Sequence, residues 1–271
     1  MSRTSTNLPV IGDGRLTYTS SGRIMLGRWV RTRVSLVGQE GGYVKTDPLP
    51  VLAVTEVQCL AHARDCTPNK SPRGIAMVGV GFGREGDAQS QSTPDKNPLL
   101  NITWRDRAFR PGYILTAKGI RIGLAPSDSA RPFQRVKLQR NAKGDDWQGA
   151  PACISINRKS PAACGGILVD SGVQDMFMTI PAAQAGGATG TFPDGTDISI
   201  DLGTANETAD LYSFATGSGS DIAPRKIYLR VSSDRVFVNT SVRLLNRYDV
   251  LYDADGGYFG VRPRPAQANE D

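Results

Sequence analysis

Histidine is nearly absent from this chain of 271 residues, because His62 is the only one. Catalytic triads that place a histidine beside a serine, and zinc sites built from several histidines, are therefore excluded unless His62 serves alone. A histidine in a surface loop is the simpler interpretation, although a cysteine–histidine nucleophile pair stays open. Hydrolysis by carboxylates is not excluded, since Asp and Glu together number 26.

Long apolar runs and clustered charge are also missing. No stretch approaches the roughly 20 apolar residues of a membrane-spanning helix, and the first ten residues lack the apolar core of a signal peptide. The net charge of +6 comes from 24 arginines and 8 lysines, which are spread along the chain without a run of four. We therefore expect a monomer with a solvated surface and neither a membrane nor a nucleic-acid partner. A β-rich nucleic-acid binder is the alternative, and its binding would depend steeply on salt.

Motifs for metals and nucleotides are absent or incomplete. Residues 81–86 match the pattern GxGxxG, but loop sequence follows where a dinucleotide site needs a helix. The chain has no Cys-x-x-Cys pair of the kind that binds zinc. We therefore expect no cofactor and no metal.

Four cysteines fall into two local couples, Cys59 with Cys66 and Cys153 with Cys164. The even count and the pairing along the sequence favour two short-loop disulfides. Disulfides imply an oxidising compartment, so a periplasmic or secreted location is expected if a signal peptide lies upstream. Four buried free thiols in a cytosolic protein are the alternative.

Short strands dominate the predicted secondary structure. Apolar segments are brief, rich in β-branched residues and bounded by Gly, Pro, Asp or Asn, and several alternate with a period of two. Thirty glycines and 17 prolines favour many turns. The expected strands are 33–37, 51–57, 76–80, 119–124, 153–156, 166–169, 197–202, 226–231 and 248–252. Two short helices are expected, at 97–103 and 181–184.

A polar, proline-rich segment at 125–132 predicts a boundary between two structural units. The expected organisation is an N-terminal unit at 1–125, a C-terminal unit at 126–262 and a disordered tail at 263–271.

The segment most informative about chemistry is an apolar strand that runs directly into Asp170-Ser171-Gly172. A buried strand end presents one carboxylate there, a small hydroxyl follows it, and glycine permits a tight turn. A plain β-turn after a strand is the alternative.

The surroundings of Asp170 resemble the pepsin-like aspartic proteases, in which each lobe carries an apolar strand ending in Asp-[Thr/Ser]-Gly. The segment 167–172 is similar to the C-terminal-lobe motif, and residues 246–261 resemble the closing hairpin. In the first half, residues 74–81 are similar to the Gly-Ile-Leu-Gly-Leu-Gly segment, and residues 16–22 look like the flap hairpin with Tyr18 as the flap tyrosine. The resemblance implies a mainly β, two-lobed acid-protease fold in a divergent, bacterial member of the family, with substrate bound in a cleft between the lobes.

The chain departs from the family pattern in one decisive respect. The family's mechanism needs two carboxylates that share one proton, one activating water and the other donating to the scissile carbonyl. Only Asp170 fits; Asp13 lacks the hydroxyl neighbour and lies too close to Tyr18. In addition, residues 239–241, Asn-Thr-Ser, replace the second apolar-apolar-Gly segment, and Val173 follows Gly172 where a hydroxyl is usual.

Two explanations of the missing carboxylate compete. In the first, the chain is truncated and its N-terminal lobe is incomplete. Lost strands would leave costly unpaired sheet edges, which argues that the natural protein is longer. Alternatively it is a pseudo-protease that keeps a cleft and binds a peptide or protein. Pairing two copies of Asp170 by dimerisation is disfavoured, because a partial N-terminal lobe would block the required face. We therefore expect an aspartic endopeptidase homologue that is inactive as written, with Asp170, Ser171 and Gly172 as the catalytic segment.

Overall fold

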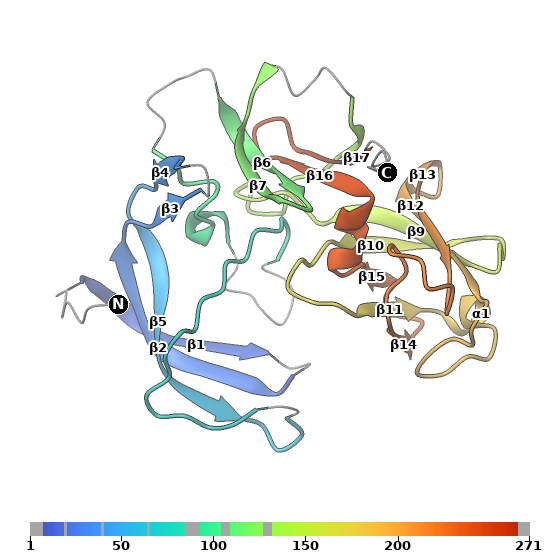
Figure 1. The fold of residues 1–271 in the computed structure, drawn as a ribbon, viewed down its shortest axis with the longest axis horizontal. Coiled ribbons are helices and arrows are strands. Elements are labelled where there is room, and N and C mark those ends of the chain that lie inside the picture. The colour runs from blue at the N-terminus through green and yellow to red at the C-terminus, as the bar shows by residue number, and fades with distance from the viewer. Residues whose placement is uncertain are drawn as a thin grey trace, which may run out of the picture. The chain divides into compact units, whose positions relative to one another are not determined.

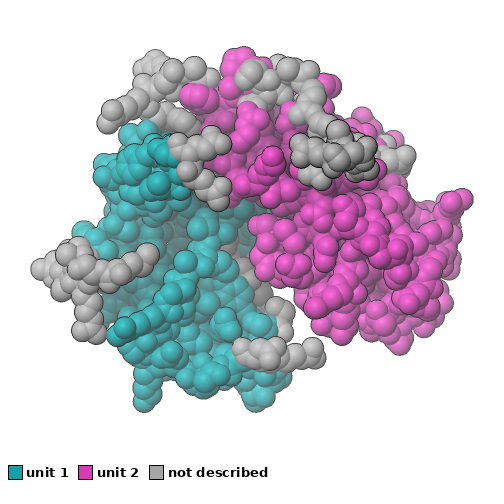
Figure 2. Space-filling model, viewed as in Figure 1, with its two compact units in different colours: residues 1–107 teal, residues 108–271 magenta. Residues whose placement is uncertain are grey.

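A computed structural model describes residues 8–18, 21–38, 41–63, 66–84, 93–103, 109–126 and 132–264. The chain divides into two compact units, Met1–Arg107 and Ala108–Asp271, which Figure 2 shows in different colours. Strands are the main regular element of both units (Figure 1), as the short alternating segments predicted. Among the described residues, no helix combines the length and the apolar character that a membrane crossing needs.

The first unit is built around a three-stranded antiparallel sheet in the order β1-β2-β5. Buried apolar side chains of this sheet include Ile24, Met25, Val30 and Val57. The pairing of β2 with β5 shifts register at Gly27, where an added Cβ would lie 2.1 Å from the Ala53 carbonyl oxygen. The elements of this unit are β1 (Val10–Tyr18), β2 (Arg23–Thr32), β3 (Ser35–Val37), β4 (Tyr43–Lys45), β5 (Leu49–Cys59) and the 3₁₀ helix η1 (Pro94–Lys96).

Two predictions for the first unit are wrong. Residues 76–80 form no strand, and Met77 and Val78 are 57% and 52% exposed, so this apolar segment has neither a pairing partner nor a core to cover it. Residues 97–103 form no helix: η1 ends just before them, a turn follows, and Ile102 forms a β-bridge with Thr46. Tertiary pairing overrides the capping signal there.

The second unit contains a seven-stranded sheet in the order β13-β12-β9-β10-β15-β11-β14. The short strand β15 lies between β10 and β11. It pairs parallel to β10 on one side and antiparallel to β11 on the other. One face is the core, since Ile198, Ile200 and Leu202 of β12 are buried while the residues between them are more exposed. The strands are β9 (Ala150–Ile156), β10 (Ala163–Leu168), β11 (Met176–Ile180), β12 (Asp197–Thr204), β13 (Glu207–Ala215), β14 (Ile227–Val231) and β15 (Phe237–Asn239).

A five-stranded sheet in the order β7-β6-β16-β17-β8 completes the second unit. Its hairpin β16–β17 is the closing hairpin that the sequence predicted. Among the described residues of this unit, short helices include α1 (Ala182–Ala185), at the predicted place, and the 3₁₀ helix η3 (Val242–Asn246). The strands are β6 (Arg110–Thr116), β7 (Gly119–Leu124), β8 (Gln134–Lys137), β16 (Tyr248–Asp253) and β17 (Tyr258–Pro263).

The division between the units differs from the expected one at 125–126. Strand β6 pairs with β16, with Ile114 opposite Leu251, so the β6–β7 hairpin belongs to the second unit rather than to the first. The expected tail also begins too early, because Pro263 still pairs with Tyr248 at the end of β17. Residues 265–271 lie outside the described part of the chain.

Both predicted disulfides are confirmed. Cys59 is bonded to Cys66 in the first unit, and Cys153 is bonded to Cys164 in the second. Cys153 and Cys164 stand directly opposite each other in the β9–β10 register, so this bond crosses between neighbouring strands.

Candidate functional site

Asp170 lies just beyond the end of β10, after the buried residue Val169. The Gly172 N–H donates to Asp170 Oδ1 over 2.9 Å. An added Cβ on Gly172 would lie 3.1 Å from that oxygen, so glycine lets the carboxylate fold back onto its own turn. The predicted Asp-Ser-Gly turn therefore holds one oxygen of the carboxylate.

The second carboxylate oxygen is held by a residue far along the chain. Asn239, the last residue of β15, donates from Nδ2 to Asp170 Oδ2 over 3.1 Å. The other end of the Asn239 amide, Oδ1, accepts a hydrogen bond of 3.0 Å from the Ser241 N–H, which fixes the direction of the side chain. Because β15 runs parallel to β10, the two strands end side by side and deliver Asn239 to Asp170.

The residues after Asn239 hold the end of β15 next to the end of β10 through hydrogen bonds. Thr240 is fully buried, and its backbone N–H donates to the Leu168 carbonyl oxygen over 2.9 Å. Ser241 is also fully buried, and its hydroxyl accepts a hydrogen bond from the Arg243 N–H at the start of η3. The polar groups of the Asn-Thr-Ser segment thus form hydrogen bonds within the protein. This explains why polar residues can replace apolar ones at a buried position.

The contact of Asn239 with Asp170 is not predicted from the sequence. Residues 239–241 stand where the family resemblance expects an apolar-apolar-Gly segment, whereas the apolar part of the inserted strand is the pair Phe237 and Val238 just before them. A usable signal was present: an apolar pair followed by a polar residue mirrors the arrangement of Leu168, Val169 and Asp170. Only the parallel pairing of β15 with β10 shows that Asn239 and Asp170 are in contact.

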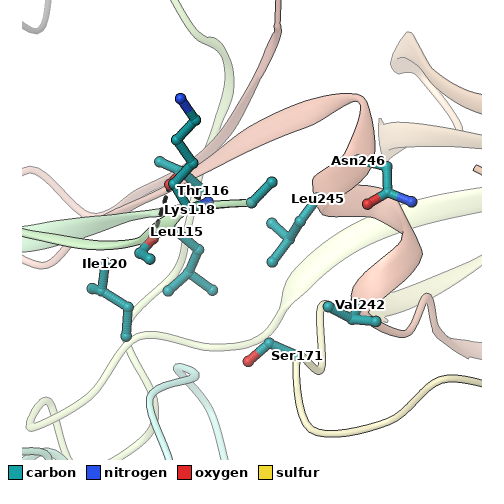
Figure 3. Close-up of a pocket in the computed structure, with 10 residues that line it drawn as sticks. Leu115, Thr116, Lys118, Ile120, Ser171, Val242, Leu245 and Asn246 are labelled. Atoms are coloured by element: carbon teal, nitrogen blue, oxygen red, sulfur yellow. Dashed lines mark hydrogen bonds between the residues drawn. The ribbon is translucent and has the colours of Figure 1, made fainter. Parts of the chain in front are cut away.

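Within the described residues, the Asp170 carboxylate accepts hydrogen bonds from Gly172 and Asn239, and Ser171 is not among its partners. Instead, Ser171 lines a pocket of about 380 Å³ between the β6–β7 turn and η3. Figure 3 shows the Ser171 side chain facing a largely apolar wall. The lining residues are Leu115, Thr116, Ala117, Lys118, Gly119, Ile120, Ser171, Val242, Leu245 and Asn246.

Tyr18 belongs to the first unit and ends β1, where it pairs with Arg23 of β2. Its hydroxyl donates to the Met77 sulfur over 2.8 Å. This contact joins the β1–β2 hairpin to residues 76–80, the apolar segment that forms no strand. The role of Tyr18 as a flap residue stays a prediction.

The chemistry available at Asp170 follows from its two partners. The Gly172 backbone N–H and the Asn239 amide both donate, so each carboxylate oxygen of Asp170 acts as a hydrogen-bond acceptor. A neutral amide cannot take or give the proton that an acid–base pair of carboxylates exchanges. Over the described ranges, no second carboxylate bonds to Asp170, and no group of three or more His, Cys, Asp or Glu is placed to hold a metal ion.

Comparison with known proteins identifies the fold. No protein-family model matches the chain, and no curated protein matches it in sequence. Among solved structures, the aspartic proteinase from Irpex lacteus is similar, with a TM-score of 0.55 over 96% of this chain and 84% of that one. The sequence identity is 9%, so the likeness concerns the fold alone. The predicted fold class, mainly β and pepsin-like, is confirmed.

Proposed function

We propose that this chain is an aspartic endopeptidase homologue that binds peptide or protein segments beside Asp170 but does not cleave them as a 271-residue chain. The observation that carries the proposal is the Asn239 amide on Asp170 Oδ2. Pepsin-like hydrolysis needs a second carboxylate to share a proton with the first. The amide that contacts Asp170 donates a hydrogen bond, but it cannot take up or release the proton that two carboxyl groups would share.

A peptide library incubated with the chain at acid pH tests the proposal. We expect no cleavage products by mass spectrometry, for the wild type and for Asp170→Asn alike. Asp145→Asn, at an exposed aspartate in another turn, is the matched control. Cleavage that is lost in Asp170→Asn and kept in Asp145→Asn would overturn the assignment as an inactive homologue.

The non-catalytic alternative, a dedicated peptide-binding module, is favoured by the same Asn239 contact. It predicts saturable peptide binding that survives Asp170→Asn, because the substituted amide keeps an oxygen for the Gly172 N–H. Binding can be measured by titrating labelled peptides and following fluorescence anisotropy. Binding that disappears in Asp170→Asn but not in Asp145→Asn would instead assign the carboxylate a direct role in holding the peptide.

The two disulfides support a place of action in an oxidising compartment, either periplasmic or secreted. The proposal further takes the chain as a monomer that needs no cofactor. Size-exclusion chromatography with light scattering checks the monomer, and a dimer would contradict it.

A further inference from the structure

The strands beside Asn239 carry aromatic side chains on the face of the seven-stranded sheet that points away from its core. Phe177 of β11 stands directly opposite Asn239 of β15 on one side and Tyr228 of β14 on the other. Residues directly opposite one another in a sheet project from the same face. The opposite face holds the buried residues Met176, Met178, Ile227, Leu229 and Val238.

A second row of side chains runs beside the first. Phe237 stands opposite Thr179, which in turn stands opposite Arg230. Phe177 is 38% exposed, yet it stacks on Tyr228 with ring centroids 5.0 Å apart. An ordered aromatic pair outside the core is typical of a contact surface.

Cations surround these rings. The Lys226 ammonium lies 4.4 Å from the Tyr228 ring centre, and the Arg235 guanidinium lies 4.3 Å from that of Phe237. Arg230 is exposed beside Thr179. We call the six residues Phe177, Tyr228, Phe237, Lys226, Arg230 and Arg235 the aromatic–cationic face.

Acidic groups near this face do not balance its charge. Asp175 is paired with Arg225 at 3.7 Å, and these two charges cancel. Asp234 accepts a hydrogen bond from the Ser233 hydroxyl and is the remaining acid in the adjoining loop. The three cations Lys226, Arg230 and Arg235 therefore outnumber the two acids, Asp234 and the Asp170 carboxylate at the Asn239 end of the row. Lys226 and Arg230 both lie on or next to β14, so the β14 side of the face is positive and attracts anionic groups.

We propose that the aromatic–cationic face binds an acidic peptide that carries an aromatic or aliphatic side chain. The inference rests on the proposed function, peptide binding beside Asp170, and it names the class of peptide. Strands lie about 4.8 Å apart, so β14 is roughly 10 Å from β15. An extended peptide advances about 3.3 Å per residue and turns every second side chain to the same face, so its acidic side chains lie two and four positions from the residue beside Asp170.

A peptide fits this face better than a single-stranded nucleic acid does. Aromatic rings and cations can also bind bases and phosphates. Here, however, the row of aromatic residues ends at Asn239, whose amide is bonded to the Asp170 carboxylate. The negative charge of that carboxylate repels a phosphate backbone. A peptide can place a backbone N–H there and its acidic side chains at the cations.

Fluorescence anisotropy with two matched labelled peptides tests the proposal. Both contain one phenylalanine. At the second and fourth positions after it, one peptide carries glutamate and the other carries lysine. We expect the acidic peptide to bind roughly tenfold more tightly at low salt, with the difference shrinking as salt screens the charges. Lys226→Glu/Arg230→Glu should remove this preference, whereas Arg158→Glu/Lys159→Glu, in the exposed β9–β10 turn, should keep it.

Phe177→Ala should weaken both peptides equally, because it removes the ring but no charge. Equal binding of the two peptides, unchanged in Lys226→Glu/Arg230→Glu, would overturn the inference and leave the proposed function standing. Failure of the wild type to bind either peptide would overturn both. A labelled thymidine oligonucleotide is the last arm: tight binding that Lys226→Glu/Arg230→Glu abolishes would assign the face to nucleic acid instead.

Discussion

The Asn239 amide, at the end of β15, donates over 3.1 Å to Oδ2 of Asp170, which lies two residues beyond the end of the parallel strand β10. With the Gly172 N–H on Oδ1, each carboxylate oxygen has a donor supplied by the protein. Because Asp170 is half-buried, losing either donor would leave a polar atom without its partner in the protein. The contact therefore matters for stability as well as for chemistry.

Asn239→Asp should make the stability of the second unit depend on pH. Two carboxylates at this distance repel when both are ionised, which raises the pKa of the introduced carboxyl. The variant should be most stable below about pH 4, where that carboxyl is protonated, and should lose about 1–3 kcal/mol as the pH rises to 7. Urea denaturation at a series of pH values measures this. The exchange Asp170→Asn/Asn239→Asp restores one carboxylate and one amide, so its curve should follow the wild type; an equal loss in both variants would contradict the explanation.

Gly165 and Gly166 are adjacent in β10 but should respond oppositely to alanine. An added Cβ on Gly165 would lie 2.0 Å from the Val236 carbonyl oxygen, a backbone atom that cannot rotate away. On Gly166 it would meet Phe237 Cδ2 at 3.7 Å, an ordinary contact. We expect Gly165→Ala to cost about 3 kcal/mol by forcing β15 away from β10, and Gly166→Ala to be neutral or stabilising by about 0.5 kcal/mol. Thermal unfolding of the two variants decides, and similar midpoints would count against the close approach.

The two disulfides should stabilise different units. Each closes a short loop, with sequence separations of 7 and 11 residues, so each should contribute about 2–3 kcal/mol by restricting the unfolded chain. Hydrogen exchange should speed up in β2 and β5 for Cys59→Ser/Cys66→Ser. For Cys153→Ser/Cys164→Ser it should speed up in β9 and β10 instead. Each double variant serves as the control for the other, and faster exchange in both units from one variant would show that the units do not unfold separately.

Tyr212 should make the protein less stable at alkaline pH. Burial raises the pKa of its phenol well above the ordinary value of 10.0, and its hydroxyl donates to the Ile222 carbonyl. The unfolded chain loses this proton near pH 10 while the folded chain keeps it. The stabilisation is therefore fully present below about pH 10 and declines as the pH rises further.

Tyr212→Phe should cost about 1–3 kcal/mol at neutral pH by leaving the Ile222 carbonyl without its donor. The variant should also show a shallower loss of stability above pH 10. Tyr228→Phe, at a ring outside the core, should change neither quantity. A wild-type stability that stays level between pH 9 and 11 would contradict the assignment.

Strands with a strict alternation were predictable. Residues 119–124 coincide with β7, and 197–202 lie within β12. In β12 the alternate apolar residues Ile198, Ile200 and Leu202 place one face of the strand in the core. The same reasoning failed at 76–80, where the apolar residues are present but no neighbouring strand pairs with them. The local sequence pattern predicts which side chains are buried. It does not predict which other strand will supply the backbone hydrogen bonds of a sheet.

Half of the candidate site was predictable for a related reason. Asp170, Ser171 and Gly172 follow one another, so an apolar strand entering a turn marked them directly. Asn239 reaches Asp170 only because β15 lies between β10 and β11 in the sheet. No local feature of residues 237–241 predicts this strand order. Ser171 was placed correctly in the turn, but the pocket around it is formed by β6, β7 and η3, which lie far away in sequence.

The insertion of β15 also sets an order of events during folding. Asp170 and Asn239 are separated by 69 residues, and β11 to β14 lie in the chain between them. Closing so long a loop costs entropy before any contact is gained, and non-local pairings of this kind form slowly. On the ribosome, Asp170 leaves the exit tunnel well before Asn239 has been synthesised. The carboxylate must therefore pass through a period in which its second oxygen is bonded only to water.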